Sequence, residues 1–229
     1  MSDVFEKSVA HHFTEITAAD WVKVREGLTR RFSGDFPYVR NNTVLNWRTE
    51  RERAAISIFA LDPRIDGIEV MPERVTLVVE GRRKTWSPAL RLTSGRNVAM
   101  TDVIRDASAK LPARQELTEL LSRVYRKRGI AYTTLLESQV RKEPRLHNAR
   151  LVLGYRGVEV GAATEMAVVA ALSTTVQVTL GELETKLAGH ADVRASVFKL
   201  ATLGLVRVDL WANSLADMSV KLVSWDGLQ

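Results

Sequence analysis

The spacing of apolar residues changes from helical to strand-like and back along this chain, which limits the folds it can adopt. Residues 45–61 and 113–127 repeat apolar positions every three or four residues, which predicts two helices. Between them, the segments 65–70, 75–79, 84–92 and 97–104 have strand composition and are separated by Gly81 and Ser94-Gly95. Gly129 ends the second helix, and a strand is predicted at 130–134. This order predicts an α/β fold, a mixed sheet flanked by helices over residues 45–135.

The first 44 residues predict an accessory helix. Thr17 and Asp20 have the spacing of a capping box, and Trp21, Val24 and Leu28 fall on one helical face. The helix is therefore expected over residues 15–32. Turn-forming residues at 33–35 and 41–42 then interrupt the chain before the predicted core.

The C-terminal part carries a series of start and stop signals. Residues 137–172 are predicted to be helical with interruptions, and Thr179 with Glu182 forms a capping box for the next helix. Asp192 begins another helix, which ends at Gly204 and precedes strands at 205–211 and 218–223. Two helices followed by a hairpin are typical of a C-terminal winged-helix domain, whose second helix usually enters the DNA major groove.

The predicted recognition helix also predicts the residues that read DNA. Val193, Val197, Leu200 and Leu203 form its apolar stripe, so the residues between them are expected to face outward. The outward residues expected to contact bases are Arg194, Ser196 and Lys199, joined by Thr202 at the end of the helix.

Length and composition are those of an ordinary folded protein. The 229 residues suffice for two domains, expected at 45–150 and 151–229 after the accessory segment 1–44. The absence of cysteine excludes disulfides and thiolate zinc sites. The N-terminus does not resemble a signal peptide and no apolar run approaches the roughly 20 residues of a membrane span, so we expect a cytoplasmic, nucleoid-associated protein that does not contact membranes.

The net charge of +6 is concentrated in residues 121–150, which hold eight Lys or Arg and two acidic residues. A solvated surface and a polyanion partner both explain such a stretch. The second explanation predicts phosphate contacts from the basic residues Arg123, Arg126, Lys127, Arg128, Arg141, Lys142 and Arg145.

Three segments, 48–79, 128–155 and 179–210, resemble the TnsA-type endonucleases of heteromeric transposases. The resemblance implies a restriction-endonuclease-like core followed by a winged helix. It also implies a site in which acidic residues and a lysine surround Mg²⁺, and such a metal would generate the attacking hydroxide.

The metal-binding residues that the resemblance implies are largely missing here. Ala89 stands where the metal-binding aspartate is expected, and Met100 and Asp102 stand where a second ligand and the lysine are expected. Only the helical glutamate remains, for which Glu52 is the best match and Glu50 the near alternative. Among Arg48, Arg51 and Arg53, Glu52 is more simply explained as a surface salt-bridge partner. We therefore predict a pseudo-nuclease with no metal and no cofactor.

The functional prediction is duplex DNA binding without cleavage, in transcriptional control or as an accessory factor of a mobile element. One alternative is an active endonuclease, in which Asp102 or Asp106 supplies a ligand after a shift of register. The other is a scaffold that docks onto a transposase or ATPase, because residues 151–229 are slightly acidic. The sequence leaves open whether the protein is a homodimer.

Overall fold

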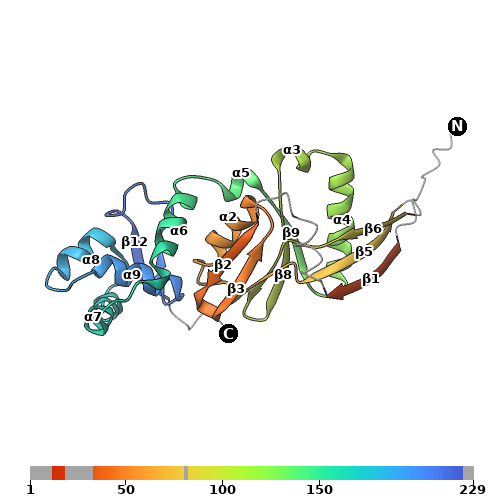
Figure 1. Ribbon diagram of the computed structural model, residues 1–229. Helices are drawn as coiled ribbons and strands as arrows, with labels where there is room; N and C mark the ends of the chain where they lie inside the picture. The colour runs from red at the N-terminus through yellow and green to blue at the C-terminus, as the bar shows by residue number, and fades with distance from the viewer. Residues whose placement is uncertain (1–11, 19–32, 80–81, 224–229) are drawn as a thin grey trace.

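The computed structural model describes residues 12–18, 33–79 and 82–223, which form a mixed α/β structure (Figure 1). Its α-helices are α2 Glu50–Phe59, α3 Asp106–Ala109, α4 Pro112–Arg126, α5 Glu137–Val140, α6 Arg145–Gly154, α7 Ala162–Ser173, α8 Leu180–Lys186 and α9 Val193–Thr202. Two short 3-10 helices are η1 Val39–Asn41 and η2 Tyr155–Gly157.

The strands form four sheets in the described residues. A four-stranded sheet has the order β4 Gly67–Val70, β7 Leu90–Ser94, β8 Asn97–Ile104 and β9 Ala131–Leu136. A three-stranded sheet has the order β1 His12–Ala18, β5 Glu73–Val79 and β6 Arg82–Trp86. The remaining sheets are the hairpin of β2 Gly34–Tyr38 with β3 Thr43–Trp47, and a small sheet of β10 Val178–Thr179, β12 Ser219–Leu222 and β11 Val206–Val208.

The four-stranded sheet confirms the predicted α/β character of the central region. β4, β7 and β8 pair antiparallel, whereas β9 pairs parallel with β8. A parallel neighbour requires a long crossover, and α4 provides it. The strand predicted at 84–92 is divided into β6 and β7, which belong to different sheets.

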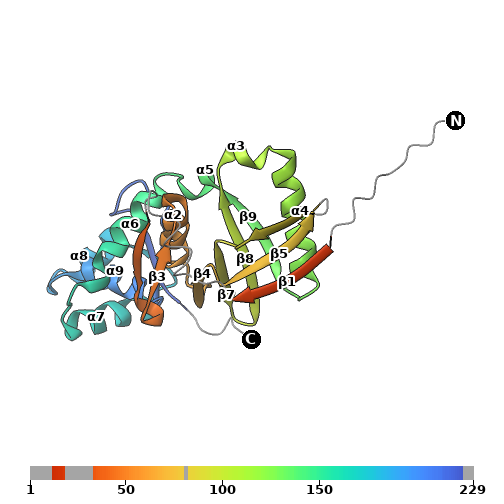
Figure 2. The same ribbon diagram turned by 45° about the vertical axis from the view of Figure 1, so that its right-hand side comes forward.

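Alternate residues of β8 belong to two apolar cores. Val103 packs with α2 and the C-terminal elements, whereas Met100 packs with Leu121 and Tyr125 of α4 and with β5. Figures 1 and 2 show α2 and α4 on opposite sides of the four-stranded sheet. Because side chains alternate along a strand, Asp102 shares the α4 side with Met100.

The predicted N-terminal accessory helix is wrong for the part that the structure describes. Residues 12–18 are a strand paired with β5, and residues 33–47 form a hairpin around Asn42, which has φ 50. Pairing with β5 satisfies the backbone hydrogen bonds of residues 12–18. Trp21, Val24 and Leu28 lie outside the described residues, and the helix predicted at 45–61 begins only at Glu50, after the N-cap Thr49.

The domain boundary expected at residue 150 falls inside α6. Ala149 and Val152 of this helix belong to one buried cluster that extends from Phe36 to Val220. Asn148 joins α6 to the C-terminal hairpin, since its Nδ2 donates to the carbonyl oxygens of Leu210 and Ala212 at 3.0 and 2.8 Å. The two regions are therefore packed around a common core.

The C-terminal elements follow the predicted order. The capping box is confirmed, because Glu182 N donates to Thr179 Oγ1 and Thr179 N donates to Glu182 Oε2. α9 ends before Gly204, which has φ +78. The short strand β10, which the sequence analysis did not predict, pairs with β12 and places α8 beside the hairpin.

Gly204 connects this region to the N-terminal hairpin through Arg40. The Arg40 guanidinium donates to the carbonyl oxygens of Ala60, Asp62 and Ile65 after α2, at 2.6 to 3.2 Å. A Cβ at position 204 would lie 2.5 Å from Arg40 Nε. Gly204 is therefore required both by its positive φ and by this close approach.

We expect Gly204→Ala to lower the free energy of unfolding by about 2–3 kcal/mol, through left-handed strain and displacement of Arg40 from its carbonyl partners. Urea unfolding followed by circular dichroism measures this loss. Gly157→Ala is the matched control, because a Cβ there meets no atom within 4 Å. Equal stability of the two variants would contradict the assigned role of Gly204.

Candidate nucleic-acid interface

Asp102 lies at the centre of a closed hydrogen-bonded cluster. Its carboxylate accepts four hydrogen bonds, and its side chain is only 3% exposed. The donors are Trp86 Nε1 at 2.7 Å, Ala89 N at 2.9 Å, Arg114 Nη2 at 2.8 Å and Tyr132 Oη at 2.5 Å. Burial and the neighbouring carboxylate raise the pKa of Tyr132, so its hydroxyl remains a donor at neutral pH.

This cluster shows where the structure places the three degenerate positions. Ala89 is 2% exposed and contributes only its backbone N–H to Asp102, while Met100 is fully buried against α4. Arg114 neutralises Asp102 and also lies 4.4 Å from the centre of the Trp86 ring. A metal ion could approach Asp102 only by breaking these contacts.

Glu52 forms a separate closed pair with Arg48. Its carboxylate accepts from Arg48 N at 2.8 Å, from Arg48 Nη2 at 2.8 Å and from Arg48 Nε at 3.1 Å. The prediction of a salt bridge is confirmed, but Glu52 is 4% exposed, so the pair is buried rather than on the surface. This burial is not evident from the sequence, because Glu52 lies between Arg51 and Arg53 in a charged stretch.

Asp106, the other substitute ligand considered, belongs to a third group of contacts. It lies in the first turn of α3 and accepts hydrogen bonds from the backbone N–H and the hydroxyl of Ser138. These hydrogen bonds lower the pKa of Asp106. Among residues 12–18, 33–79 and 82–223, no three His, Asp or Glu side chains gather closely enough to hold a metal ion.

A cleft of about 790 Å³ lies between α2, the end of β8 and α4, and we call it the arginine cleft. Five arginines and two glutamates contribute to its wall: Arg48, Arg51, Arg105, Arg114, Arg141, Glu50 and Glu137. The first turns of α2 and α4 also border it. Helix N-termini favour anions, so this charge and these dipoles act in the same direction.

The arginines of the cleft differ in how far their charge is already neutralised. Arg48 and Arg114 are held by buried carboxylates, and Arg141 forms an exposed pair with Glu137 at 3.1 Å. Arg51 donates only Nε to the carbonyl oxygen of Val103, at 2.8 Å. Arg105 is exposed and forms no ion pair in the described part of the chain. Arg51, Arg105 and Arg141 are therefore the cations most available to an anion.

The basic stretch 121–150 does not form one surface, contrary to expectation. Figures 1 and 2 place the end of α4 beside β1 and the α5–α6 connection on the far side of the sheet. Arg123, Arg126, Lys127 and Arg128 thus lie apart from Arg141, Lys142 and Arg145, because strand β9 crosses the molecule between them. The sequence holds no local signal of this separation.

The group at the end of α4 is also partly occupied by internal ion pairs. Arg123 lies 3.7 Å from Glu119, while Arg128 donates to both carboxylate oxygens of the buried Glu73 at 2.5 and 3.1 Å. Burial raises the pKa of Glu73, but the hydrogen bonds of Arg128 and Tyr125 and the charges of Arg128 and Arg91 together outweigh it and leave this pKa below its usual range. Arg126 and Lys127 remain exposed. Among the described residues, Arg126 and Lys127 are thus the cations of this group that form no ion pair.

The predicted outward face of α9 is wrong for Ser196 and Thr202, whereas Arg194 is exposed and Lys199 is partly exposed. Ser196 is fully buried and Thr202 is 2% exposed, because α6, η2, α7, α8 and β11 pack around the helix. Arg194 pairs with Glu184 at 2.7 Å and Lys199 pairs with Glu165 at 2.9 Å. The sequence does carry a sign of this burial, because the apolar residues Phe198 and Ala201 lie on the face of α9 that was expected to be polar.

No protein-family model matches this chain, and no curated protein matches it in a sequence search. Within the described residues, no helix has both the length and the apolar character that crossing a bilayer requires. The arginine cleft therefore has to be interpreted from its own chemistry.

Proposed function

We propose that the protein binds duplex DNA without cleaving it, and that the arginine cleft is the principal contact surface. The observation that carries the proposal is one open cleft between two helix N-termini in which Arg51, Arg105 and Arg141 are not held by buried carboxylates. Phosphate contacts from arginines and helix N-termini account for much of the affinity of DNA-binding proteins.

The order of elements supports a restriction-endonuclease-like core. α2, the antiparallel strands β4, β7 and β8, the crossover helix α4 and the parallel strand β9 follow the order expected from the TnsA resemblance. α7, β10, α8, α9 and the β11–β12 hairpin follow the order of a winged helix. Because α9 is covered, the cleft rather than this helix is the proposed contact with DNA.

The chemistry of the remaining acids supports binding rather than cleavage. Carboxylates that bind a catalytic metal need free oxygens directed at a shared point. Asp102, Glu52 and Asp106 instead belong to three separate hydrogen-bonded groups, closed by Arg114, Arg48 and Ser138. We therefore assign this scaffold a binding role, in transcription or on a mobile element.

A titration of the full chain with a short random duplex at several salt concentrations tests the proposal. We expect saturable binding whose logarithmic salt slope corresponds to at least about two phosphate contacts. In parallel, supercoiled plasmid incubated with Mg²⁺ or Mn²⁺ should remain uncut. Absence of duplex binding at low salt would refute the proposal, and nicking that disappears in Glu52→Ala would establish the endonuclease alternative.

The scaffold alternative has one observation in its favour, the apolar outer side of α7. Met166 is 72% exposed and Val169 is 39% exposed. An exposed apolar helix face is typical of protein contacts. If the duplex titration fails, docking onto a protein becomes the leading proposal for this chain.

A further inference from the structure

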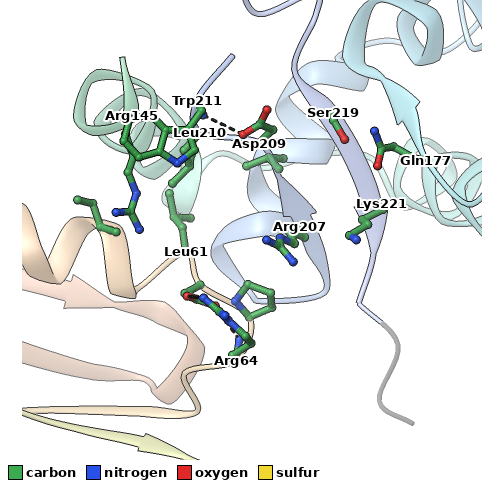
Figure 3. Close-up of a pocket in the computed structure, with 14 residues that line it drawn as sticks. Leu61, Arg64, Arg145, Gln177, Arg207, Asp209, Leu210, Trp211, Ser219 and Lys221 are labelled. Carbon is green, nitrogen blue, oxygen red and sulfur yellow. Dashed lines mark hydrogen bonds and ion pairs between the residues drawn. The ribbon is translucent and has the colours of Figure 1, made fainter. Parts of the chain in front are cut away.

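A second recess, which we call the hairpin pocket, lies between the end of α2 and the outer face of the small C-terminal sheet. Its volume is about 420 Å³. Figure 3 shows Arg64, Arg145, Arg207 and Lys221 around this recess, on four different segments of the chain. Sequence order does not bring these four cations together, since the first and last are separated by most of the chain.

Three of these cations have no ion-pair partner in the described residues. Arg64 is neutralised by Asp62, to which it donates two hydrogen bonds at 2.7 and 2.9 Å. Arg145, Arg207 and Lys221 form no ion pair within 4.0 Å in residues 12–18, 33–79 and 82–223. The other acid of the wall, Asp209, accepts from Trp211 N at 2.9 Å. The recess therefore has an excess of positive charge.

The small sheet places two of the cations directly opposite each other. Arg207 on β11 pairs in register with Lys221 on β12, while the adjacent Val206, Val208 and Val220 point into the core. Like charges at opposed positions of an antiparallel ladder repel each other. An anion between them would offset this repulsion, which the charge of Asp62 opposes only in part, because Asp62 is already paired with Arg64.

The rest of the wall supplies the other features of an anion site. Gln177 and Ser219 add neutral hydrogen-bond donors beside Lys221 (Figure 3). Arg145 lies 5.5 Å from the centre of the Trp211 ring, which is partly exposed. The volume lies within the roughly 300–1,000 Å³ of small-molecule sites, so the recess admits more than a single phosphate group.

We propose that the hairpin pocket binds the phosphate groups of a phosphorylated small molecule, through Arg145, Arg207 and Lys221. Cations and neutral donors arranged around one point are the chemistry that recognises phosphate oxygens. A recess of this size accepts a small phosphorylated compound whole, but only a single backbone phosphate of a duplex. This inference goes beyond DNA binding and does not depend on it.

Isothermal titration calorimetry of the full chain with sodium tripolyphosphate, at constant ionic strength, tests the proposal. We expect saturable one-site binding that Arg207→Gln/Lys221→Gln weakens roughly tenfold or more, as expected for losing hydrogen bonds to a charged group. Arg96→Gln/Lys186→Gln is the matched control, because it removes the same two residue types at exposed positions elsewhere. Its affinity should remain within about twofold of the parent.

Two further measurements separate loss of the site from loss of the fold and from binding of a duplex. The exchanged variant Arg207→Lys/Lys221→Arg retains both charges and should retain binding, which separates loss of the site from loss of the fold. A saturating short duplex should leave tripolyphosphate binding unchanged. Displacement of tripolyphosphate by the duplex would overturn the small-molecule assignment in favour of a backbone phosphate. The absence of saturable heat, or an equal loss of affinity in the control variant, would overturn the site.

Discussion

Asp102→Ala is expected to lower the free energy of unfolding by about 3–5 kcal/mol, one of the two largest effects predicted for this protein. The substitution removes the acceptor of four hydrogen bonds at once. It leaves the Arg114 side chain, only 9% exposed, without its carboxylate. A buried cation without a partner is far more costly than a lost surface pair. Chemical unfolding in urea measures the loss.

Two further variants separate the charge from the packing. Asp35→Ala removes an exposed carboxylate that accepts one hydrogen bond from Asn46, and should cost at most about 1 kcal/mol. Asp102→Leu/Arg114→Leu removes both charges and should recover part of the loss, as apolar replacements of buried ion pairs often do.

The sign of the Asp102→Ala effect also bears on function. Carboxylates kept for catalysis are often neutral or unfavourable for stability, because function rather than folding maintains them. A stability change near zero or a gain would therefore contradict the internal role of Asp102 and favour the endonuclease alternative. A large loss would support the assignment of Asp102 to the interior.

Replacing Arg51, Arg105 and Arg141 together with glutamine should weaken duplex binding roughly 10²-fold at about 0.1 M salt, if each of the three contacts a phosphate. The logarithmic salt slope should decrease by about two to three, because each lost contact no longer releases a counterion. All three side chains lie in the arginine cleft and are not held by buried carboxylates. Fluorescence anisotropy with specific and random duplexes measures both quantities.

Two controls decide which surface carries the affinity. Arg96→Gln/Lys186→Gln removes two exposed charges away from the cleft and should change affinity only by about twofold to threefold. Arg194→Gln tests the predicted recognition helix, and its effect should be similarly small because Glu184 already holds Arg194. A larger effect from Arg194→Gln than from the cleft variant would place the DNA on α9 instead.

Local signals in the sequence determined much of the secondary structure. The helix predicted at 113–127 is α4, and it ends where Gly129, with φ +69, lets the chain turn. The strand predicted at 97–104 is β8 with the same bounds, and Thr179 with Glu182 begins α8. In each case the signal and its effect lie within a few residues, so neighbouring side chains and backbone suffice to specify the element.

Tertiary structure alone decided which polar residues are buried and which of them meet. Ser196 has the spacing of an exposed residue, but five elements pack around α9 and enclose it. The Asp102 cluster joins residues 86, 89, 114 and 132, whose proximity depends on strand pairing and on the α4 crossover. The hairpin pocket likewise depends on the register of β11 with β12 and on the packing of both against the end of α2. Such contacts depend on distances across the fold, which periodicity and local capping do not encode.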